Sequence, residues 1–238
     1  MAEGAKLAEI LAYQLESEII DGDWTVGDVI GQEPELMRRY RVSRAVFREA
    51  VRIVEGHLVG RMRRGRNGGL VVTEPTPQAV SDVMRIYLRS LKVDDAELFE
   101  ARVSIESVCL TLAMERLTSS DEQRLLEQAS LEQEALTRET YEDYAAGHGL
   151  HLLIAELSRN RPLFLFVHSL VNLTRHHPNH PSVLVHREAG CRAHRSITDS
   201  ILNGNLPQAT DQMTRHLRDI ATWWQSSDKQ QPETRASA

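Results

Sequence analysis

The sequence predicts a mainly α-helical fold in which an N-terminal winged helix-turn-helix, with a small β-hairpin wing, precedes a C-terminal all-α bundle. Three observations predict it. Near the start of the chain, two amphipathic helical patterns are separated by a tight turn. Two short apolar strands around a glycine-rich tip come next. From Ala79 to Trp224, apolar residues then recur almost throughout at helical spacing.

The composition agrees with a folded chain of one large domain or two ordinary ones. The protein has 238 residues, of which 41% are hydrophobic, so a core is available. No apolar run reaches the length of a membrane span and the first residues lack signal-peptide form, so we expect a cytoplasmic protein with no membrane partner. Cys109 and Cys191 lie far apart and outside any Cys-x-x-Cys, which argues against a disulfide framework or zinc finger.

The first helices are marked by their boundaries. One amphipathic helix ends near Asp21-Gly22-Asp23; its apolar residues are Leu7, Ile10, Leu11, Leu15 and Ile19. Residues 24–32 form an irregular or extended connection. Pro34 suits the first turn of a second helix, where its missing N–H is not needed. A turn at Arg41-Val42 then leads to Ser43, a preferred N-cap residue, which opens the third helix.

This third helix has one apolar and one basic face. Its apolar face contains Val46, Phe47, Ala50, Val51 and Val54. Arg44, Arg48 and Arg52 recur every four residues on another face. Three exposed guanidinium groups over an apolar underside suit a helix that lies in the major groove of DNA. The alternative is a solvated amphipathic helix, and the charge of the surrounding segment decides against it.

The charge of the chain is unevenly placed. The net charge is −6, yet residues 36–72 contain ten arginines and two glutamates, which gives a local charge of +8. Such a basic region matters more for binding phosphates than the total does.

The predicted hairpin belongs to this basic region. Its tip, residues 63–69, carries Arg63, Arg64 and Arg66, so we expect a wing that reaches phosphates or the minor groove. The predicted DNA-binding residues are therefore Ser43, Arg44, Arg48, Arg52, Arg64, Gly65 and Arg66. A nucleotide-phosphate loop is the alternative for the glycine-rich tip, but the following helix and the Gly-Lys-Ser/Thr ending are both missing.

Glu74-Pro75-Thr76-Pro77 is the predicted linker, because its two prolines prevent a helix from continuing. We therefore assign residues 1–75 to the winged helix-turn-helix, 76–226 to an all-helical domain and 227–238 to a disordered tail. In the second domain, Ser119 and Glu122 have the spacing of a capping box. Further helices are expected at about 125–138, 141–158, 163–173, 187–202 and 207–225.

Motifs in a fixed order connect the first domain with a known family. They are Gly22–Asp28, Glu33–Leu36, Val42–Arg44, Arg48–Val51 and the wing segment Arg64–Val72. With them, residues 7–75 resemble the winged-helix domain of the GntR family of bacterial transcription regulators. One position departs from the family pattern: the usual arginine of Ser-Glu-Arg-Glu-Leu, a phosphate contact in relatives, is Pro34 here. We expect a homodimer that binds a palindromic operator, because two-fold operators reflect two-fold proteins and a single small winged helix binds weakly alone.

Residues 80–225 look like the all-helical ligand domain of the FadR-type (FCD) branch of that family. The segments that carry the resemblance are Glu100–Glu106, Leu150–Asn160, His194–Ile197 and Arg215–Leu217. It implies an effector-binding and dimerisation domain, and a repressor that a small organic acid releases. Arg102 matches the family arginine that points into the ligand cavity, where it would hold a carboxylate. The alternative is that Arg102 and Glu106 form only an ion pair within one helix.

The same resemblance implies a metal site. Much of this branch holds a divalent metal through an aspartate, a histidine four residues later and two more histidines. His151, His194 and His216 occupy the histidine positions, and zinc or nickel would suit nitrogen ligands. Gly147 stands at the aspartate position, so a water or the effector fills the gap, or the site holds no metal; His148 is a weaker substitute ligand.

A second histidine cluster lies between prolines. His176, His177 and His180 are interpreted as a solvated loop in preference to a surface metal site.

Other function classes fit the sequence less well. A metal-dependent enzyme built on the three histidines is the alternative, but the chain has no HExxH motif, no nucleophile with a base and no paired carboxylates near the histidines. An architectural DNA binder would have no need of the large helical domain. We therefore expect a ligand-controlled transcription regulator and no enzyme activity.

Overall fold

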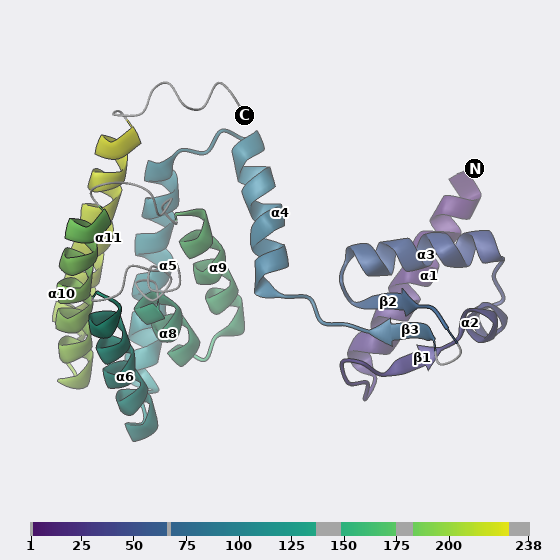
Figure 1. Cartoon of the computed structure of the whole chain (residues 1–238), viewed down its shortest axis with the longest axis horizontal. Coiled ribbons are helices and arrows are strands. Elements are labelled where there is room, and N and C mark those ends of the chain that lie inside the picture. The colour runs from purple at the N-terminus through teal and green to yellow at the C-terminus, as the bar shows by residue number, and fades with distance from the viewer. Residues whose placement is uncertain (1, 66–67, 137–148, 175–182, 229–238) are drawn as a thin grey trace. The chain divides into compact units, whose positions relative to one another are not determined.

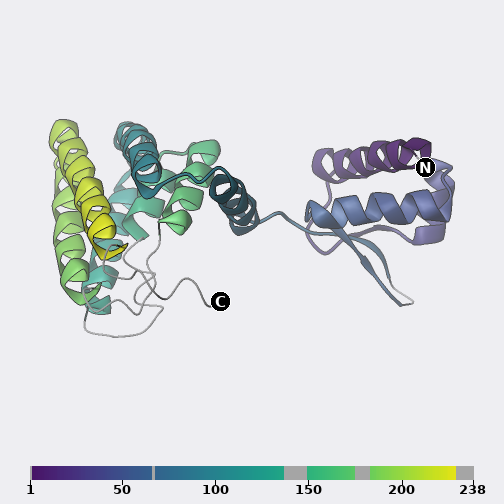
Figure 2. The ribbon, with the colours of Figure 1, turned by 90° about the horizontal axis from the view of Figure 1, so that it is seen from above.

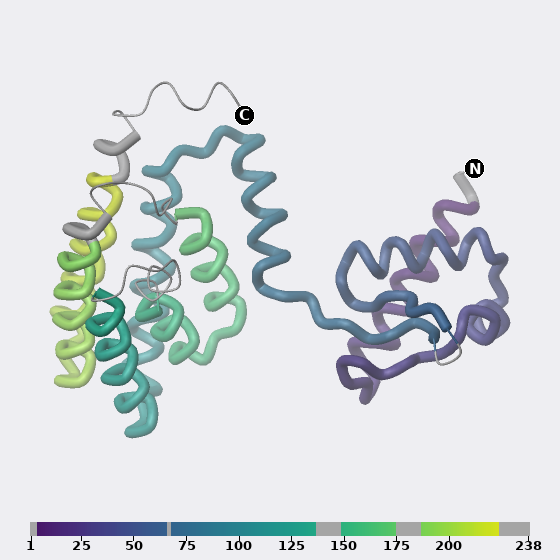
Figure 3. The backbone as a smooth tube through the Cα atoms, in the orientation of Figure 1, coloured from purple at the N-terminus to yellow at the C-terminus, as the bar shows by residue number. Residues whose placement is uncertain are grey.

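The computed structural model describes residues 2–65, 68–136, 149–174 and 183–228 (Figure 3). The chain divides into two compact units, Met1–Thr76 and Pro77–Ala238. The predicted fold class is confirmed, because the first unit is a winged helix-turn-helix and the second is all-helical. Among the described residues, no helix is both long enough and apolar enough to cross a membrane.

The first unit combines three helices with a small sheet. Its elements are α1 (Ala2–Asp21), β1 (Val29–Gly31), α2 (Glu33–Tyr40), α3 (Arg44–Gly56), β2 (Gly60–Arg63) and β3 (Gly69–Val72). The antiparallel sheet has the strand order β1-β3-β2, and β2 pairs with β3 from Gly60↔Val72 to Arg63↔Gly69. In Figure 2, α1 and α3 run side by side, and β2 and β3 form a narrow ribbon, which is the predicted hairpin.

The turn between α2 and α3 follows from its residues. Arg41 ends α2 in the left-handed conformation (φ 54°), and its N–H donates to the carbonyl of Arg38. Ser43 is the N-cap of α3, where its hydroxyl accepts a hydrogen bond from the N–H of Val46 at 3.4 Å. The apolar side of α3 then packs on α1; the buried residues of this core include Leu11, Leu15, Phe47, Ala50 and Val54. This packing leaves the arginine face of α3 exposed.

The second unit is a bundle of helices around α5. Its elements are α4 (Pro77–Ser90), α5 (Asp95–Glu115), α6 (Ser119–Ala135), α8 (Gly149–Leu157), α9 (Arg161–Leu173), α10 (Val183–Leu202) and α11 (Leu206–Asp228) (Figure 1). Helix α5 contacts α8, α9 and α11, while α6 packs against α8 and α10. Helix α4 packs on α9, and α10 lies beside α11.

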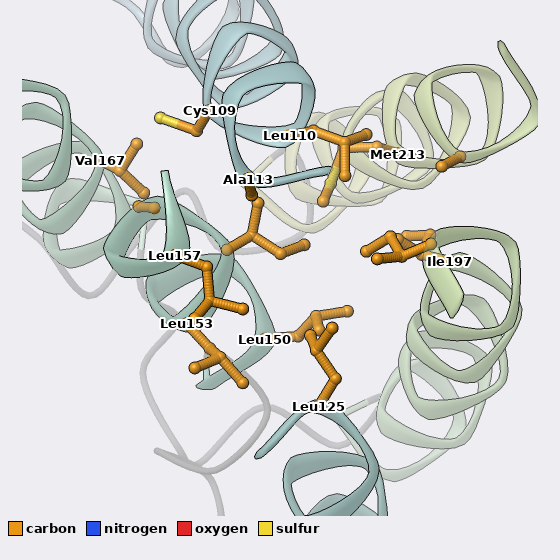
Figure 4. Close-up of a cluster of buried hydrophobic side chains, with 14 of the residues drawn as sticks. Cys109, Leu110, Ala113, Leu125, Leu150, Leu153, Leu157, Val167, Ile197 and Met213 are labelled. Carbon is orange, nitrogen blue, oxygen red and sulfur yellow. The ribbon is translucent and has the colours of Figure 1, made fainter. Parts of the chain in front are cut away.

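An apolar core fixes these helices relative to one another. Figure 4 shows side chains of five helices meeting there: Leu110 and Ala113, Leu125, Leu150 and Leu157, Ile197, and Met213. Because Leu150 is only 1% exposed, its truncation to alanine would cost about 2–5 kcal/mol. The same helices carry the polar residues of the candidate site, so the core sets their positions.

The start of α6 and the end of α11 differ from the prediction. The N-cap of α6 is Thr118, not Ser119, and the capping box closes with Asp121, one residue earlier than Glu122. The reason is that Asp121 also forms an ion pair with Arg159, which favours this register. Helix α11 continues to Asp228, so it includes the first two residues of the segment predicted as a tail, and the rest of that segment lies outside the described residues.

Candidate nucleic-acid interface and metal centre

The exposed face of α3 carries the three arginines that the sequence singles out. The side chains of Arg44, Arg48 and Arg52 are 65%, 64% and 75% exposed. Phe47 and Ala50, on the other side of the helix, are buried. Helix α3 thus presents the basic outer surface and apolar underside expected of a helix that enters the major groove.

Two carboxylates of the same unit contact these arginines. Nε of Arg44 lies 3.0 Å from Oε1 of Glu33, and Nε of Arg48 lies 3.4 Å from the same oxygen. Arg52 instead donates from Nη1 to Oε2 of Glu49, 2.9 Å away. Glu33 is not identified as functional from the sequence, because a glutamate in the first turn of a helix is expected from the helix dipole alone.

The hairpin adds basic residues next to α3. Strand β2 ends at Arg63, and Arg64 and Gly65 follow, with Gly65 at φ 107°, which favours glycine. A groove of about 600 Å³ separates the hairpin from α3; the basic residues that line it are Arg48, Arg52, Arg63 and Arg64. Predicted residue Arg66 lies outside the described residues. The structure therefore brings helix and wing arginines to one groove.

In the second unit, the three predicted histidines meet in the bundle. His151 of α8, His194 of α10 and His216 of α11 are all buried. Nε2 of His194 lies 3.2 Å from Nε2 of His151 and 2.9 Å from Nε2 of His216. Three ring nitrogens from three helices thus lie within 4.8 Å of one another.

Two buried carboxylates contact Nδ1 of two of these histidine rings. Oε2 of Glu106, on α5, lies 2.5 Å from Nδ1 of His151. Oε2 of Glu132, on α6, lies 2.7 Å from Nδ1 of His194. From the sequence, Glu106 is named only as an ion-pair partner of Arg102. Glu132 is not identified, because it lies in a mostly polar helix where its sequence neighbours do not distinguish it.

Burial and ion pairing set the protonation states. Burial is the largest single influence on Glu106 and raises its pKa, but the charges and hydrogen bonds of Arg102 and His151 together outweigh it and hold the pKa at about 2. Burial is also the largest single influence on Glu132, but His194, together with Gln128 and His151, outweighs it and keeps that pKa lowered. Burial lowers the pKa of His151, which favours the neutral ring. Nδ1–H therefore donates to a charged carboxylate, and Nε2 of the neutral ring keeps its lone pair.

This donor set fits a divalent metal ion. Zinc–nitrogen bonds are about 2.0–2.1 Å long, so two nitrogens on one ion lie roughly 2.9–3.4 Å apart for bond angles between about 90° and 109°. The separations from His194 to the other two rings, 3.2 and 2.9 Å, fall in this range, and all three ligand atoms lie within 4.8 Å of one another. Carboxylates that accept from the far nitrogen of a ligating histidine are the usual support of such sites.

Arg102 lies next to this cluster and is 1% exposed. Its Nε donates to Oε1 of Glu106 at 2.7 Å, and its Nη1 donates to Oγ1 of Thr174 at 2.9 Å. Its Nη2 has no hydrogen-bond partner among the described residues. The ion pair between Arg102 and Glu106 is therefore present, and Nη2 of the same guanidinium group remains a buried donor without a hydrogen-bond partner among the described residues.

Several predicted positions lie outside the described residues: Gly147 at the family's aspartate position, His148, and the second histidine cluster His176, His177 and His180. The site is therefore built here from Glu106, Glu132 and the three histidines of the bundle.

Comparisons with known proteins find a matching domain family and similar relatives. Residues 97–219 match the sequence profile of the FCD domain. The chain is 26% identical to the Uxu operon regulator of Haemophilus influenzae over 215 residues, which cover 87% of this chain and 77% of that protein. It is 24% identical to the Exu regulon transcriptional regulator of Escherichia coli K12 over 222 residues, which cover 91% of this chain and 84% of that protein.

A solved structure shares the fold. The structure of a GntR protein of Streptococcus agalactiae superposes with a TM-score of 0.69 at 20% sequence identity, covering 91% of this chain and 99% of that one. At this identity the likeness concerns the fold alone.

Proposed function

Because the chain belongs to the GntR family of bacterial transcription regulators and carries its FCD domain, we propose that it is a repressor that a small organic acid releases from DNA. The relatives are named as operon or transcriptional regulators, and the basic first unit is the part of this chain that suits DNA. In this proposal Arg44, Arg48 and Arg52 enter the major groove, and Arg64 contacts a groove or phosphate from the wing.

The observation that carries the sensor proposal is the convergence of three ring nitrogens in the helical core. His151, His194 and His216 would hold a zinc or nickel ion through Nε2. When bound, the ion would supply a Lewis-acidic position for a carboxylate oxygen. Glu106 and Glu132 orient two of the rings and hold their protons on Nδ1, away from the ligand atoms.

Arg102 would supply the hydrogen-bonding half of the effector site. Its Nη2 is buried and has no partner among the described residues, although a buried donor of this kind is normally paired. Glu106 and Thr174 fix the rest of the guanidinium group, so the position of the remaining donor is set before any ligand arrives. A small carboxylate is the ligand class that matches a buried cationic donor.

An apolar stripe on α4 supports a homodimer. Val80, Val83 and Tyr87 are spaced along one side of this helix and are exposed, and the exposed Leu91 directly follows its last residue. A neighbouring side of the helix, which includes the buried Ser81, packs on α9. We assign the stripe to contact with a second copy, because a palindromic operator needs two winged units.

Two measurements on the full chain test the proposed function. Selection from a pool of random DNA duplexes should recover a palindromic sequence. A thermal-shift screen of small organic acids, with and without Zn²⁺ or Ni²⁺, should then find compounds that both raise the melting temperature and release that duplex. A compound that raises the melting temperature but tightens DNA binding would contradict the release mechanism.

A further inference from the structure

One carboxylate oxygen joins two of the three arginines on α3. Oε1 of Glu33 lies 3.0 Å from Nε of Arg44 and 3.4 Å from Nε of Arg48. The two arginines are one helical turn apart, and Glu33 comes from the neighbouring helix α2. The glutamate side chain is 21% exposed, whereas both arginine side chains are about two-thirds exposed. The mostly buried carboxylate of Glu33 thus contacts the Nε side of two exposed guanidinium groups.

The position of Glu33 is itself fixed by the start of α2. Glu33 is the first residue of the helix, directly before Pro34, whose ring restricts the backbone. Gln32 and Glu35 form a capping box around the same turn. The negative charge of Glu33 is favoured at a helix N-terminus by the helix dipole. The carboxylate therefore belongs to a rigid part of the first unit.

The atom that Glu33 contacts decides what each arginine can still do. A guanidinium group is planar, and when Nε is engaged its two terminal nitrogens remain as a parallel pair of donors. Such a pair matches O6 and N7 of guanine in the major groove. Arg52 differs, because Glu49 of its own helix accepts from its terminal Nη1 at 2.9 Å. Arg44 and Arg48 are thus held in a form suited to reading bases, and Arg52 is not.

We propose that Glu33 is a positioning residue for sequence recognition: it orders Arg44 and Arg48 so that their terminal nitrogens read two guanines, while Arg52 contributes mainly to phosphate binding. The inference rests on the proposed operator binding. Holding the side chains in place before DNA arrives lowers the entropy lost on binding. A carboxylate beside DNA also repels phosphates, so Glu33 weakens binding to every sequence while favouring the correct one.

These opposite effects give the test. Wild-type protein first selects a duplex from a random pool; dissociation constants are then measured for this duplex and a scrambled one at one salt concentration. In Glu33→Gln, the preference for the selected duplex should fall about tenfold or more, the value of a good bidentate contact. Binding to the scrambled duplex should stay the same or tighten, because one negative charge is removed. Selection repeated with Glu33→Gln should also lose guanine preference at the positions concerned.

Glu49→Gln is the matched control. It also removes one negative charge beside an arginine of α3, but Glu49 contacts Arg52. Its preference for the selected duplex should stay within about twofold of wild type, since no base-reading pair is disturbed. In an Arg44→Ala/Arg48→Ala background, Glu33→Gln should have no further effect on the preference.

Two results would overturn the inference. If Glu33→Gln tightens binding to both duplexes equally, Glu33 acts only through its charge. If the wild type selects no sequence at all, the proposed operator binding fails, and a positioning role for Glu33 fails with it.

Discussion

Arg159 donates a hydrogen bond from Nη2 to Oδ2 of Asp121, 2.7 Å away. Arg159 follows the end of α8 with φ at 51°, and Asp121 closes the capping box of α6. The pair thus joins the two helices that carry His151 and Glu132. This ion pair lies outside the candidate metal centre but helps to hold its two helices together.

The first prediction concerns acid stability. Hydrogen bonding from the side chain of Thr118 lowers the pKa of Asp121 below its ordinary value of 3.8, and Arg159 adds to this shift. Because the folded-state pKa is depressed, the stabilisation is present above about pH 4 and is lost as the pH falls further. Asp121→Asn should therefore unfold at lower urea concentration than wild type at neutral pH, and the gap should narrow toward about pH 3. A gap that stays constant with pH would contradict this.

The second prediction concerns the metal. Glu132→Gln keeps the size of the side chain but removes the charge that accepts from Nδ1 of His194. Loss of such a supporting carboxylate should weaken binding of Zn²⁺ or Ni²⁺ about 10–100-fold in calorimetric titration. Glu127→Gln on the exposed side of the same helix is the control and should bind as wild type does. Equal affinity in all three proteins would assign Glu132 a purely structural role.

The third prediction concerns Arg102. Arg102→Lys keeps the positive charge beside Glu106 but removes the forked donors, so an organic acid found by thermal shift should bind at least about tenfold more weakly. Affinity for the selected DNA duplex, measured without the acid, should be unchanged. Thermodynamic coupling must also be reciprocal in wild type. DNA should weaken acid binding by the same free energy, typically about 1–3 kcal/mol, by which the acid weakens DNA binding.

The fourth prediction separates the roles of α3 and the wing. Arg44→Ala should cost about 1–3 kcal/mol on the selected duplex and relax base choice at one position. Arg64→Ala should weaken binding to selected and scrambled duplexes alike and reduce the salt slope by about one, if the wing contacts a phosphate. Fluorescence anisotropy over a salt series measures both. Identical behaviour of the two variants would reject the division of labour.

The fifth prediction concerns the stripe on α4. Val83→Glu places a charge in the middle of the proposed interface, so sedimentation at micromolar concentration should show a monomer that binds the palindrome more weakly. Arg89→Gln changes the charge of the same helix by the same one unit outside the stripe, and it should remain a dimer. A dimeric Val83→Glu protein would place the interface elsewhere.

The sequence predicts the fold well because helix periodicity, Ser43 as a cap and the glycine-rich hairpin are all local signals. The three histidines lie on separate helices far apart in sequence, so they could be named only from the positions of the family motifs. Glu132 and Glu33 could not be named. Their roles depend on contacts with residues 62 and 15 positions away, on other helices, and no local pattern encodes such a pairing. The cap of α6 was misplaced by one residue for the same reason, because Arg159 helps to select Asp121.

The convergence of the histidines has a mechanical consequence. No disulfide links these helices, because the described cysteines, Cys109 and Cys191, are free thiols. Burial raises the pKa of each to about 11. A metal ion shared by His151, His194 and His216 would close chain segments of 43 and 22 residues. It would then act on this domain as a reversible cross-link, in the way that a disulfide acts on an extracellular protein. The rigidity of α8, α10 and α11 would rise and fall with the metal supply of the cell.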